Sequence, residues 1–151
     1  MARILSRGSA PESGGKNFES HCTHSHFEVL AMWDEAIRMK TLEILQEARN
    51  LLSTPDKWTQ NYIARDDKNH GLESAISPDA TCWCMSGAVL KAAETDSLSL
   101  EWIDLLEKAI KELHPEFHLV GGIPGFNDTH THEEVLRVFD RAIESCKSLN
   151  L

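Results

Sequence analysis

Cysteine, long apolar runs and positive charge are all scarce in this 151-residue sequence. The four cysteines are too few for a disulfide framework, and Cys82 and Cys84 stand too close together to bridge each other comfortably. No segment approaches the ~20 consecutive apolar residues that cross a bilayer, and residues 1–20 lack the apolar block of a signal peptide. We therefore expect a cytoplasmic protein that neither spans a membrane nor is secreted.

Basic residues are outnumbered by acidic ones. The chain has 24 aspartates and glutamates against 15 lysines and arginines, which gives a formal charge of -9. Binding to a nucleic-acid backbone requires a concentrated cationic face, so we expect no direct nucleic-acid ligand. An acidic surface keeps a protein soluble, and it also suits a basic partner protein.

What the sequence does contain is the composition of an ordinary globular domain. It has 41% hydrophobic and 26% charged residues, and the chain is long enough to bury one core. Residues 1–23 consist largely of glycine, serine, proline and charged residues, with little apolar surface to repay the entropy of ordering them. We expect a flexible tail over 1–23 and a single helical domain over 24–151.

Apolar residues recur at helical spacing in four segments. The first predicted helix starts near Phe27 and stops before Pro55, because proline disfavours helical geometry in the residue ahead of it. The second follows Ser77-Pro78 and is expected over 79–95, where nearly every residue is apolar or small, as in a central helix.

The remaining two helices have clear start signals. One begins at Ser97 or Ser99 and ends at Pro115, and the last follows a capping box, Thr131-His-Glu-Glu134, with its apolar stripe facing inward. Residues 121–128 are predicted to be a loop. The sequence thus predicts an all-α domain of four helices or slightly more, in which the middle of the chain and residues 117–120 could add a minor strand pair.

The unusual local motif is Cys82-Trp83-Cys84, which is predicted to lie in the first turns of the second helix. Exposed N–H groups there would lower a thiol pKa and favour a nucleophile. His118 or His130 could then act as the base, with Asn127 orienting it. The motif is loosely similar to the thiol region of papain-like cysteine peptidases, but the chain is too short for the β-barrel half of that fold. Buried structural cysteines are the alternative.

Two groups of residues have the chemistry of metal ligands. Cys82, Cys84, His130 and His132 are of the types that bind zinc, but residues two apart on a helix point in nearly opposite directions. His21, His24 and His26 have better spacing for a transition metal, although a polar linker can contain such a cluster by chance. We predict no functional metal site and no cofactor.

Polar residues gather in two segments that show no clear periodicity, Trp58 to Asp67 and Gly121 to Asp128. If these segments meet at the head of the second helix, they form a pocket. Alternatively, Arg65 pairs with Asp66 or Asp128 and holds the loops down, while Asn127 and Asp128 form an Asx turn. The predicted binding residues are Trp58, Gln60, Arg65, Asp66, Trp83, Asn127 and Asp128.

A combination of motifs resembles a known family. The chain contains Trp58-Thr-Gln60, then Ala64-Arg65-Asp66, then Cys82-Trp83-Cys84-x-x-Gly87-Ala88, and finally Asn127-Asp128 before the last predicted helix. Over residues 42–145 the pattern is similar to small bacterial and phage proteins classed only as a domain of unknown function. Phe126 stands where a tryptophan is usual. The resemblance implies a phage or mobile-element setting and transfers no mechanism.

Two functions of different classes follow from these patterns. The leading hypothesis is a non-enzymatic accessory factor or inhibitor of phage or mobile-element type that binds a host protein. The alternative is a small pocket enzyme or ligand-binding protein that uses Cys82 or Cys84 with a loop histidine. Apolar residues off the main stripe of the first helix, among them Met39 and Leu42, are also compatible with a homodimer.

Overall fold

The computed structural model describes residues 35–149 of the chain. The chain divides into two compact units, Met1–Ile37 and Arg38–Leu151, and the helices and the sheet lie in the second unit. The tail predicted over 1–23 lies outside the described residues, as does the start of the domain predicted over 24–151. That division of the chain therefore stays a prediction.

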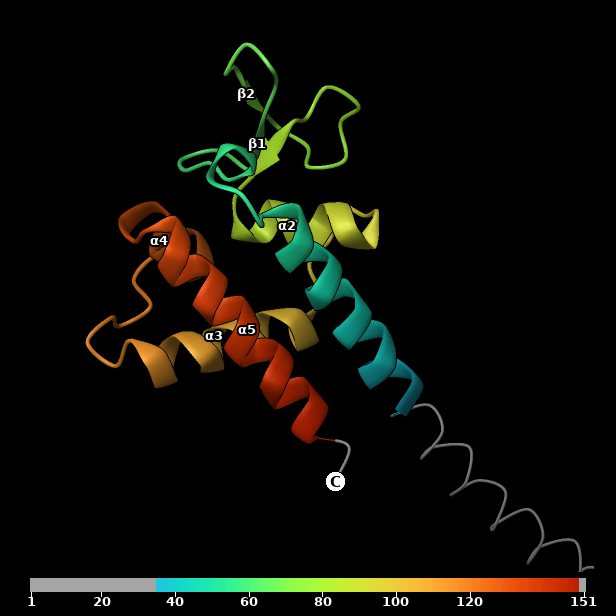
Figure 1. Cartoon of the computed structure of the whole chain (residues 1–151), viewed down its shortest axis with the longest axis vertical. Helices are drawn as coiled ribbons and strands as arrows, with labels where there is room; N and C mark the ends of the chain where they lie inside the picture. Colours follow the sequence, from blue (N-terminus) through green and yellow to red (C-terminus); the bar gives the residue numbers. More distant parts are fainter. Residues whose placement is uncertain (1–34, 150–151) are drawn as a thin grey trace, which may run out of the picture. The chain divides into compact units, whose positions relative to one another are not determined.

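The described chain is mostly helical, as the sequence predicts. A helix over 38–51 runs antiparallel to α5 (His132–Ser148), since Leu52 O accepts a hydrogen bond from His132 Nε2 while Arg38 O lies near Cys146 Sγ. Helix α3 (Leu100–Leu113) packs against α5 (Figure 1). The start of α3 after Ser99 and its end before Pro115 are confirmed.

Helix α5 begins at the predicted capping box. Thr131 Oγ1 accepts a hydrogen bond from Glu134 N, and the Glu134 carboxylate accepts one from Thr131 N. This reciprocal pair satisfies two N–H groups that would otherwise lack partners at the start of the helix. The predicted inner face is buried, and it contributes Val135, Val138, Phe139, Ala142 and Cys146.

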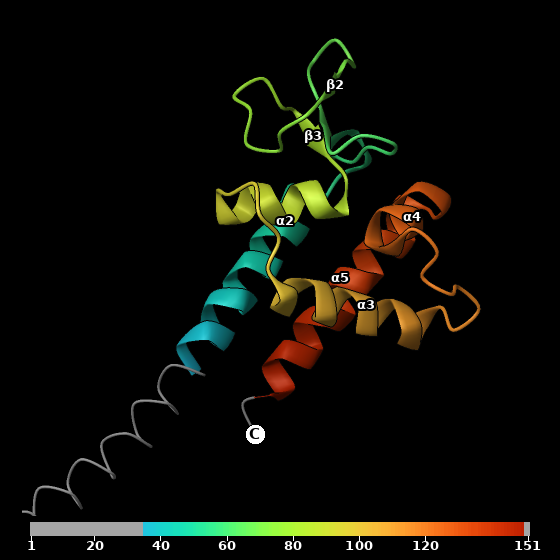
Figure 2. The same ribbon diagram turned by 180° about the vertical axis from the view of Figure 1, so that it is seen from behind.

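The middle of the chain forms a small antiparallel sheet. After the short helix η1 (Pro55–Lys57) come β1 (Ala64–Arg65), β2 (Gly71–Leu72) and β3 (Cys82–Trp83), with β1 in the centre. Ala64 pairs with both Leu72 and Trp83. Figure 2 shows the sheet next to the start of α2 (Met85–Ala93). A minor sheet was expected, but residues 117–120 are turn and coil and take no part in it.

The predicted start of the second helix at residue 79 is wrong. Ser77 Oγ does accept a hydrogen bond from Asp79 N, as a helix cap would, but no helix follows this turn. Thr81 N and Cys84 N donate instead to Arg65 O and Ile63 O, so this segment pairs with β1. Sheet pairing therefore uses the backbone groups that a helix would need, and α2 begins only at Met85.

The predicted loop at 121–128 is also wrong, because this segment forms α4 (Gly122–Thr129). Gly121 and Gly122 have φ of 80° and 64°, a left-handed conformation that glycine adopts without steric cost and that turns the chain into the helix. Pro124 lies in the first turn, where its missing N–H leaves no helical bond unmade. The Gly and Pro content that indicated a loop is thus used to start a short helix.

The core is formed by the inner faces of these helices together with β1 and β3. Its largest fully buried side chains include Phe126, Phe139, Leu45, Leu52 and Met85. Within residues 35–149, no helix is long and apolar enough to cross a membrane.

Candidate functional site

Asn127, on α4, is the centre of a buried polar network. Its side chain is fully buried. Its Oδ1 accepts hydrogen bonds from Trp58 Nε1 at 2.7 Å and from Met85 N at 3.1 Å, and its Nδ2 donates to Thr59 O at 3.0 Å. One carboxamide thus joins the segment after η1, the start of α2 and α4. The meeting of these two segments at the head of the second helix, which the sequence left as a condition, is thus present in the structure.

Two neighbouring side chains extend this network. Gln60 Nε2 donates to Asn127 O and His130 O, which are carbonyls at the C-terminal end of α4. Asp128 Oδ1 accepts from Asn61 N at 2.8 Å and from Asn127 Nδ2 at 3.1 Å. These bonds hold the 58–61 segment on α4, so Asn127 and Asp128 do not form the Asx turn considered from the sequence.

Arg65 has a different role from the ion pair considered from the sequence. Its guanidinium donates to Thr59 Oγ1 at 2.7 Å and to the carbonyl oxygens of Asn69 and Gln60. It also lies over the Tyr62 ring, 4.4 Å from the ring centroid. Arg65 therefore braces the loop on both sides of β1 through neutral oxygens and a cation–π contact.

Two other predicted binding residues, Asp66 and Trp83, stabilise the sheet and its adjoining turns. Asp66 Oδ1 accepts from Lys68 N and His70 N across the β1–β2 turn. The His70 N–H bond, followed by the Lys68 one, holds the pKa of Asp66 below its usual value despite some desolvation. Trp83 is buried, and its Nε1 donates to Ala75 O.

The cysteines do not lie in the first turns of a helix. Cys82 is in β3 and half-buried, while Cys84 is buried and is the N-cap of α2, where Sγ accepts from Gly87 N at 3.3 Å. Burial raises the pKa of the Cys84 thiol, and the nearby Asp128 charge acts in the same direction. Within residues 35–149, no histidine is hydrogen-bonded to either thiol, and His118 is exposed.

A small pocket opens beside Cys84. It has a volume of about 160 Å³ and is lined by the 61–63 segment, the start of α2 and two residues of α4. Its lining residues are Asn61, Tyr62, Ile63, Cys84, Ser86, Pro124 and Asp128. Ser86 is buried, and its hydroxyl has no hydrogen-bond partner in the described structure. The pocket therefore has an apolar wall and a carboxylate, and one of its lining residues carries an unsatisfied hydroxyl that is shielded from solvent.

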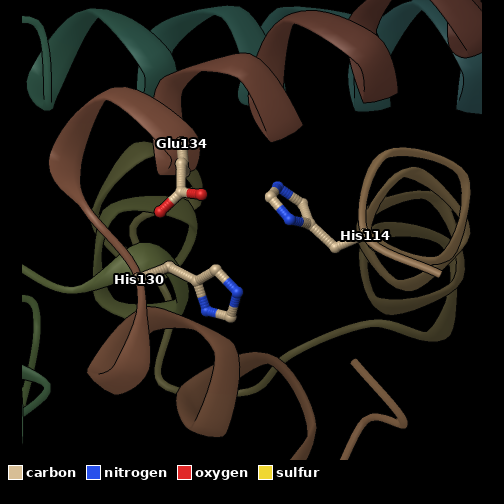
Figure 3. A group of neighbouring side chains, drawn as sticks. All are labelled: His114, His130 and Glu134. Carbon is tan, nitrogen blue, oxygen red and sulfur yellow. The ribbon is translucent and has the colours of Figure 1, made fainter. Parts of the chain in front are cut away.

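A second cluster contains His114, His130 and Glu134. One ligand atom from each lies within 4.8 Å of those of the other two, and all three residues are half-buried. Figure 3 shows the three side chains converging from the end of α3, the end of α4 and the first turn of α5. Imidazole and carboxylate are both ligands of divalent transition metals.

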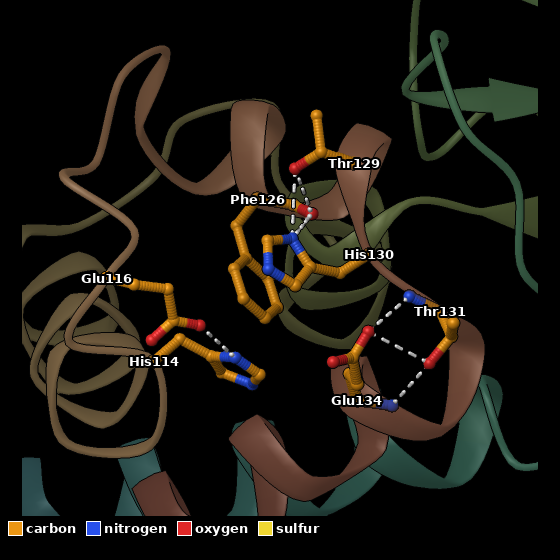
Figure 4. A network of polar contacts seen from close by, with 7 residues as sticks. All are labelled: His114, Glu116, Phe126, Thr129, His130, Thr131 and Glu134. Atoms are coloured by element: carbon orange, nitrogen blue, oxygen red, sulfur yellow. Dashed lines mark hydrogen bonds and ion pairs between the residues drawn. The ribbon is translucent and has the colours of Figure 1, made fainter.

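Hydrogen bonds orient both imidazoles of this cluster (Figure 4). His130 Nδ1 lies 2.9 Å from both Phe126 O and Thr129 Oγ1. Because Thr129 Oγ1 can donate to Gly125 O at 2.8 Å and Phe126 O can only accept, the network favours the proton on Nδ1. His114 Nδ1 lies 3.3 Å from the Glu116 carboxylate and donates to it in the same way. The ring of His130 also stacks on Phe126, with centroids 3.8 Å apart. In both histidines Nε2 is left as the atom with a free lone pair.

The Glu134 carboxylate is also held in place. Its Oε1 accepts from Thr131 N and Thr131 Oγ1, at 2.9 and 3.1 Å. The Thr131 N–H bond is the main reason that the pKa of Glu134 is lowered, and the two histidines contribute. Both bonds use Oε1, so Oε2 is the carboxylate oxygen open to a further interaction.

The sequence pointed to only one member of this cluster. His130 was a candidate base, Glu134 was assigned to the capping box, and His114 was not singled out. The spacing of His130 and Glu134 could have indicated a pair, but His114 joins them only through the packing of α3 on α4 and α5. The set Cys82, Cys84, His130 and His132 is not brought together, and His21, His24 and His26 lie outside the described residues.

Comparison with known proteins identifies the family of the chain. The model of a family described as a family of unknown function, DUF6197, matches residues 38–145. No curated protein and no solved structure matches the chain significantly. The expected resemblance to a family of unknown function is confirmed, and a bacterial or phage origin stays a prediction.

Proposed function

The chain belongs to the DUF6197 family of unknown function, and we propose that it is a non-catalytic protein that binds a small ligand in the pocket beside Cys84. Two properties of the thiol favour binding over catalysis. Burial raises the pKa of Cys84, and its sulfur already caps α2. A cysteine nucleophile needs the opposite, a low pKa and a free sulfur next to a base.

The unsatisfied hydroxyl of Ser86 is the observation that supports this proposal. A buried polar group without a partner costs roughly 1–3 kcal/mol, and Ser86, a residue that lines the pocket, carries such a group. The hydroxyl is shielded from solvent, so a ligand would reach it only after the Ser86 side chain turns toward the pocket, and a hydrogen bond formed there would remove this cost. Tolerating an unfavourable group in the free protein is typical of residues kept for function.

The lining of the pocket narrows the chemistry of the ligand. A volume of about 160 Å³ is close to that of an engineered cavity that holds benzene. Tyr62, Ile63 and Pro124 offer apolar contacts, and the Asp128 carboxylate favours an N–H donor. We therefore propose a small, flat molecule with an amine, amidine or amide group.

Benzamidine and 2-aminopyridine are suitable probes, with benzoate as the anionic control. Titration followed by heteronuclear NMR should move the signals of Tyr62, Ile63 and Ser86 with the two cationic or donor-bearing probes and not with benzoate. Failure of both probes to move these signals at millimolar concentration would contradict the proposed ligand class.

The Ser86→Ala variant separates a binding role from a structural one. The Ser86 hydroxyl has no partner in the wild type, so removing it should cost no stability. The free energy of unfolding of the variant should equal that of the wild type or exceed it by up to about 1 kcal/mol. It should nevertheless bind the probes several-fold more weakly. A loss of stability larger than about 1 kcal/mol would mean that the hydroxyl is satisfied and structural.

A partner protein remains the second proposal. Its support is the charge of -9 and two strongly exposed apolar side chains, Leu100 and Val120, with relative exposures of 73% and 77%. Pull-down with the wild-type chain and a Leu100→Ser, Val120→Ser double variant tests it. A partner captured equally by both, or by neither, would contradict the role of these residues.

A further inference from the structure

The gap between His114, His130 and Glu134 has the donor set of a transition-metal site. It offers two imidazole nitrogens and one carboxylate, which come from three different elements. From this convergence we infer that the cluster binds a divalent first-row transition-metal ion, with Zn²⁺ as the probe. This site is separate from the pocket beside Cys84 and does not depend on the ligand proposed there.

The orientation of the two histidines supports the inference most directly. Metal-binding histidines usually donate the second ring N–H to a carbonyl or a carboxylate, which fixes the tautomer and aims the other nitrogen at the metal. His130 donates from Nδ1 to Phe126 O, and His114 donates from Nδ1 to Glu116 (Figure 4). In the neutral form of each ring, Nε2 is therefore the nitrogen that can bind a metal.

The distances require only a small adjustment. With bonds of ~2.0–2.2 Å to nitrogen or oxygen, two ligands of a tetrahedral Zn²⁺ ion lie roughly 3.3–3.5 Å apart. The three ligand atoms now lie within 4.8 Å of one another. Rotation about the side-chain bonds of His114 and Glu134 would close this difference. The capping bond of Glu134 uses Oε1, so Oε2 is free to move toward the metal.

The composition of the cluster also selects the class of ion. Mg²⁺ and Ca²⁺ bind sets of oxygen ligands, whereas imidazole suits zinc and its neighbours in the first row. Three protein ligands leave at least one coordination position for water, since zinc is usually four-coordinate. An ion bound here would link the end of α3 to the end of α4 and the start of α5.

The full-length chain should be tested in a background that lacks the other histidine cluster. His21, His24 and His26 are replaced by asparagine, so that metal bound there does not obscure the result. Isothermal titration with Zn²⁺ should show one ion per chain, and Mg²⁺ should show no binding. Absence of stoichiometric Zn²⁺ binding in this background would overturn the inference.

Conservative variants test the ligands while preserving the fold. His130→Phe keeps the stacking on Phe126, and Glu134→Gln keeps a capping acceptor for Thr131. Each should weaken Zn²⁺ binding at least ~100-fold, since even residues that only orient a ligand are worth 10–100-fold. Glu116→Gln, which acts through His114, should weaken it roughly tenfold.

Two matched controls show whether any loss is specific. His118→Phe removes an exposed histidine outside the cluster, and Glu133→Gln removes an exposed carboxylate next to Glu134. Both should bind Zn²⁺ as the background chain does. Equal weakening by His118→Phe and His130→Phe would mean adventitious surface binding and would overturn the site.

A stability measurement gives an independent readout. Ligand binding to the folded state raises the melting temperature by mass action, so Zn²⁺ at 100 times its Kd should raise it by several degrees. This rise should disappear in Glu134→Gln and persist in Glu133→Gln. The circular dichroism of each metal-free variant shows whether it is folded before titration, and a rise that persists in Glu134→Gln would contradict the proposed ligand set.

Discussion

At the scale of single residues, polar side chains in this protein mostly stabilise backbone that lies outside helices. Asp66 illustrates this role, because its carboxylate accepts two N–H groups of the β1–β2 turn. The sequence placed Asp66 correctly in a polar segment but could not say whether it faces a ligand or its own turn. The answer depends on the turn geometry, in which Asn69 has a φ of 68° and returns the chain toward Asp66.

The lowered pKa of Asp66 makes a pH dependence testable. A carboxyl with a depressed folded pKa stabilises the fold above its unfolded pKa, and this contribution is lost as the pH falls through the folded value. Asp66→Asn should therefore be less stable than wild type at neutral pH, and the difference should shrink in acid below the usual aspartate range. Urea unfolding of both proteins from pH 7 to pH 3 measures this. A difference that stays constant with pH would contradict an ionised role.

The two thiols next to Trp83 should differ in reactivity. Burial raises the pKa of Cys84, whereas Cys82 is half-buried. In a chain with Cys22 and Cys146 replaced by serine, a thiol reagent at neutral pH should label Cys82 at least ~10-fold faster than Cys84. Mass spectrometry of peptides after timed quenching gives both rates. Faster labelling of Cys84 would favour the cysteine-enzyme hypothesis.

At the scale of elements, helices with one apolar stripe could be predicted from the sequence. Helices whose start depends on distant pairing, or that contain glycine and proline, could not. Helices α3 and α5 follow from periodicity and capping, because each buries a single face. The start of α2 was misplaced because Ser77 and Pro78 imitate a helix start, while distant pairing with β1 decides the outcome. Helix α4 was missed because glycine and proline normally indicate a loop.

The contact between α2 and the backbone of Ile63, just before β1, depends on a glycine. A Cβ added at Gly87 would lie 2.0 Å from Ile63 O, which is backbone and cannot move aside easily. Alanine usually stabilises a helix by about 1 kcal/mol over glycine. Gly87→Ala should instead destabilise the protein by about 1–3 kcal/mol, as overpacking does. Chemical denaturation measures the change, and a gain in stability would show that this close approach is not maintained.

At the scale of the whole molecule, Asn127 joins segments that are far apart in sequence. Trp58 and Met85 precede it by 69 and 42 positions, and both donate to its single carbonyl oxygen. Trp58, Gln60, Asn127 and Asp128, four of the predicted binding residues, lie in this one network and hydrogen-bond largely to one another or to nearby backbone. Their predicted role in binding stays a prediction. The His114 cluster was missed since no local pattern reports which helix ends meet.

Removing the Asn127 side chain should therefore have a large effect. Asn127→Ala leaves Trp58 Nε1, Met85 N and Thr59 O without their present partner, and each unsatisfied buried group costs roughly 1–3 kcal/mol. We expect a loss of about 3–5 kcal/mol in the free energy of unfolding. Asn50→Ala, at an exposed helical position, should change it by less than about 0.5 kcal/mol. Similar small losses in both variants would contradict the central role of Asn127.

The same carboxamide has a consequence for the order in which the chain folds. Its bonds close long loops, and loop closure is entropically costly before other contacts are made. Helix α5 and the β1–β2 turn contain local contacts and can form earlier, whereas the Asn127 bonds have to wait until all three segments have docked. Stopped-flow kinetics of Asn127→Ala should then show a faster unfolding rate and a nearly unchanged folding rate. The Asn127 hydrogen bonds would then form after the transition state for folding, and their main kinetic effect would be to slow unfolding.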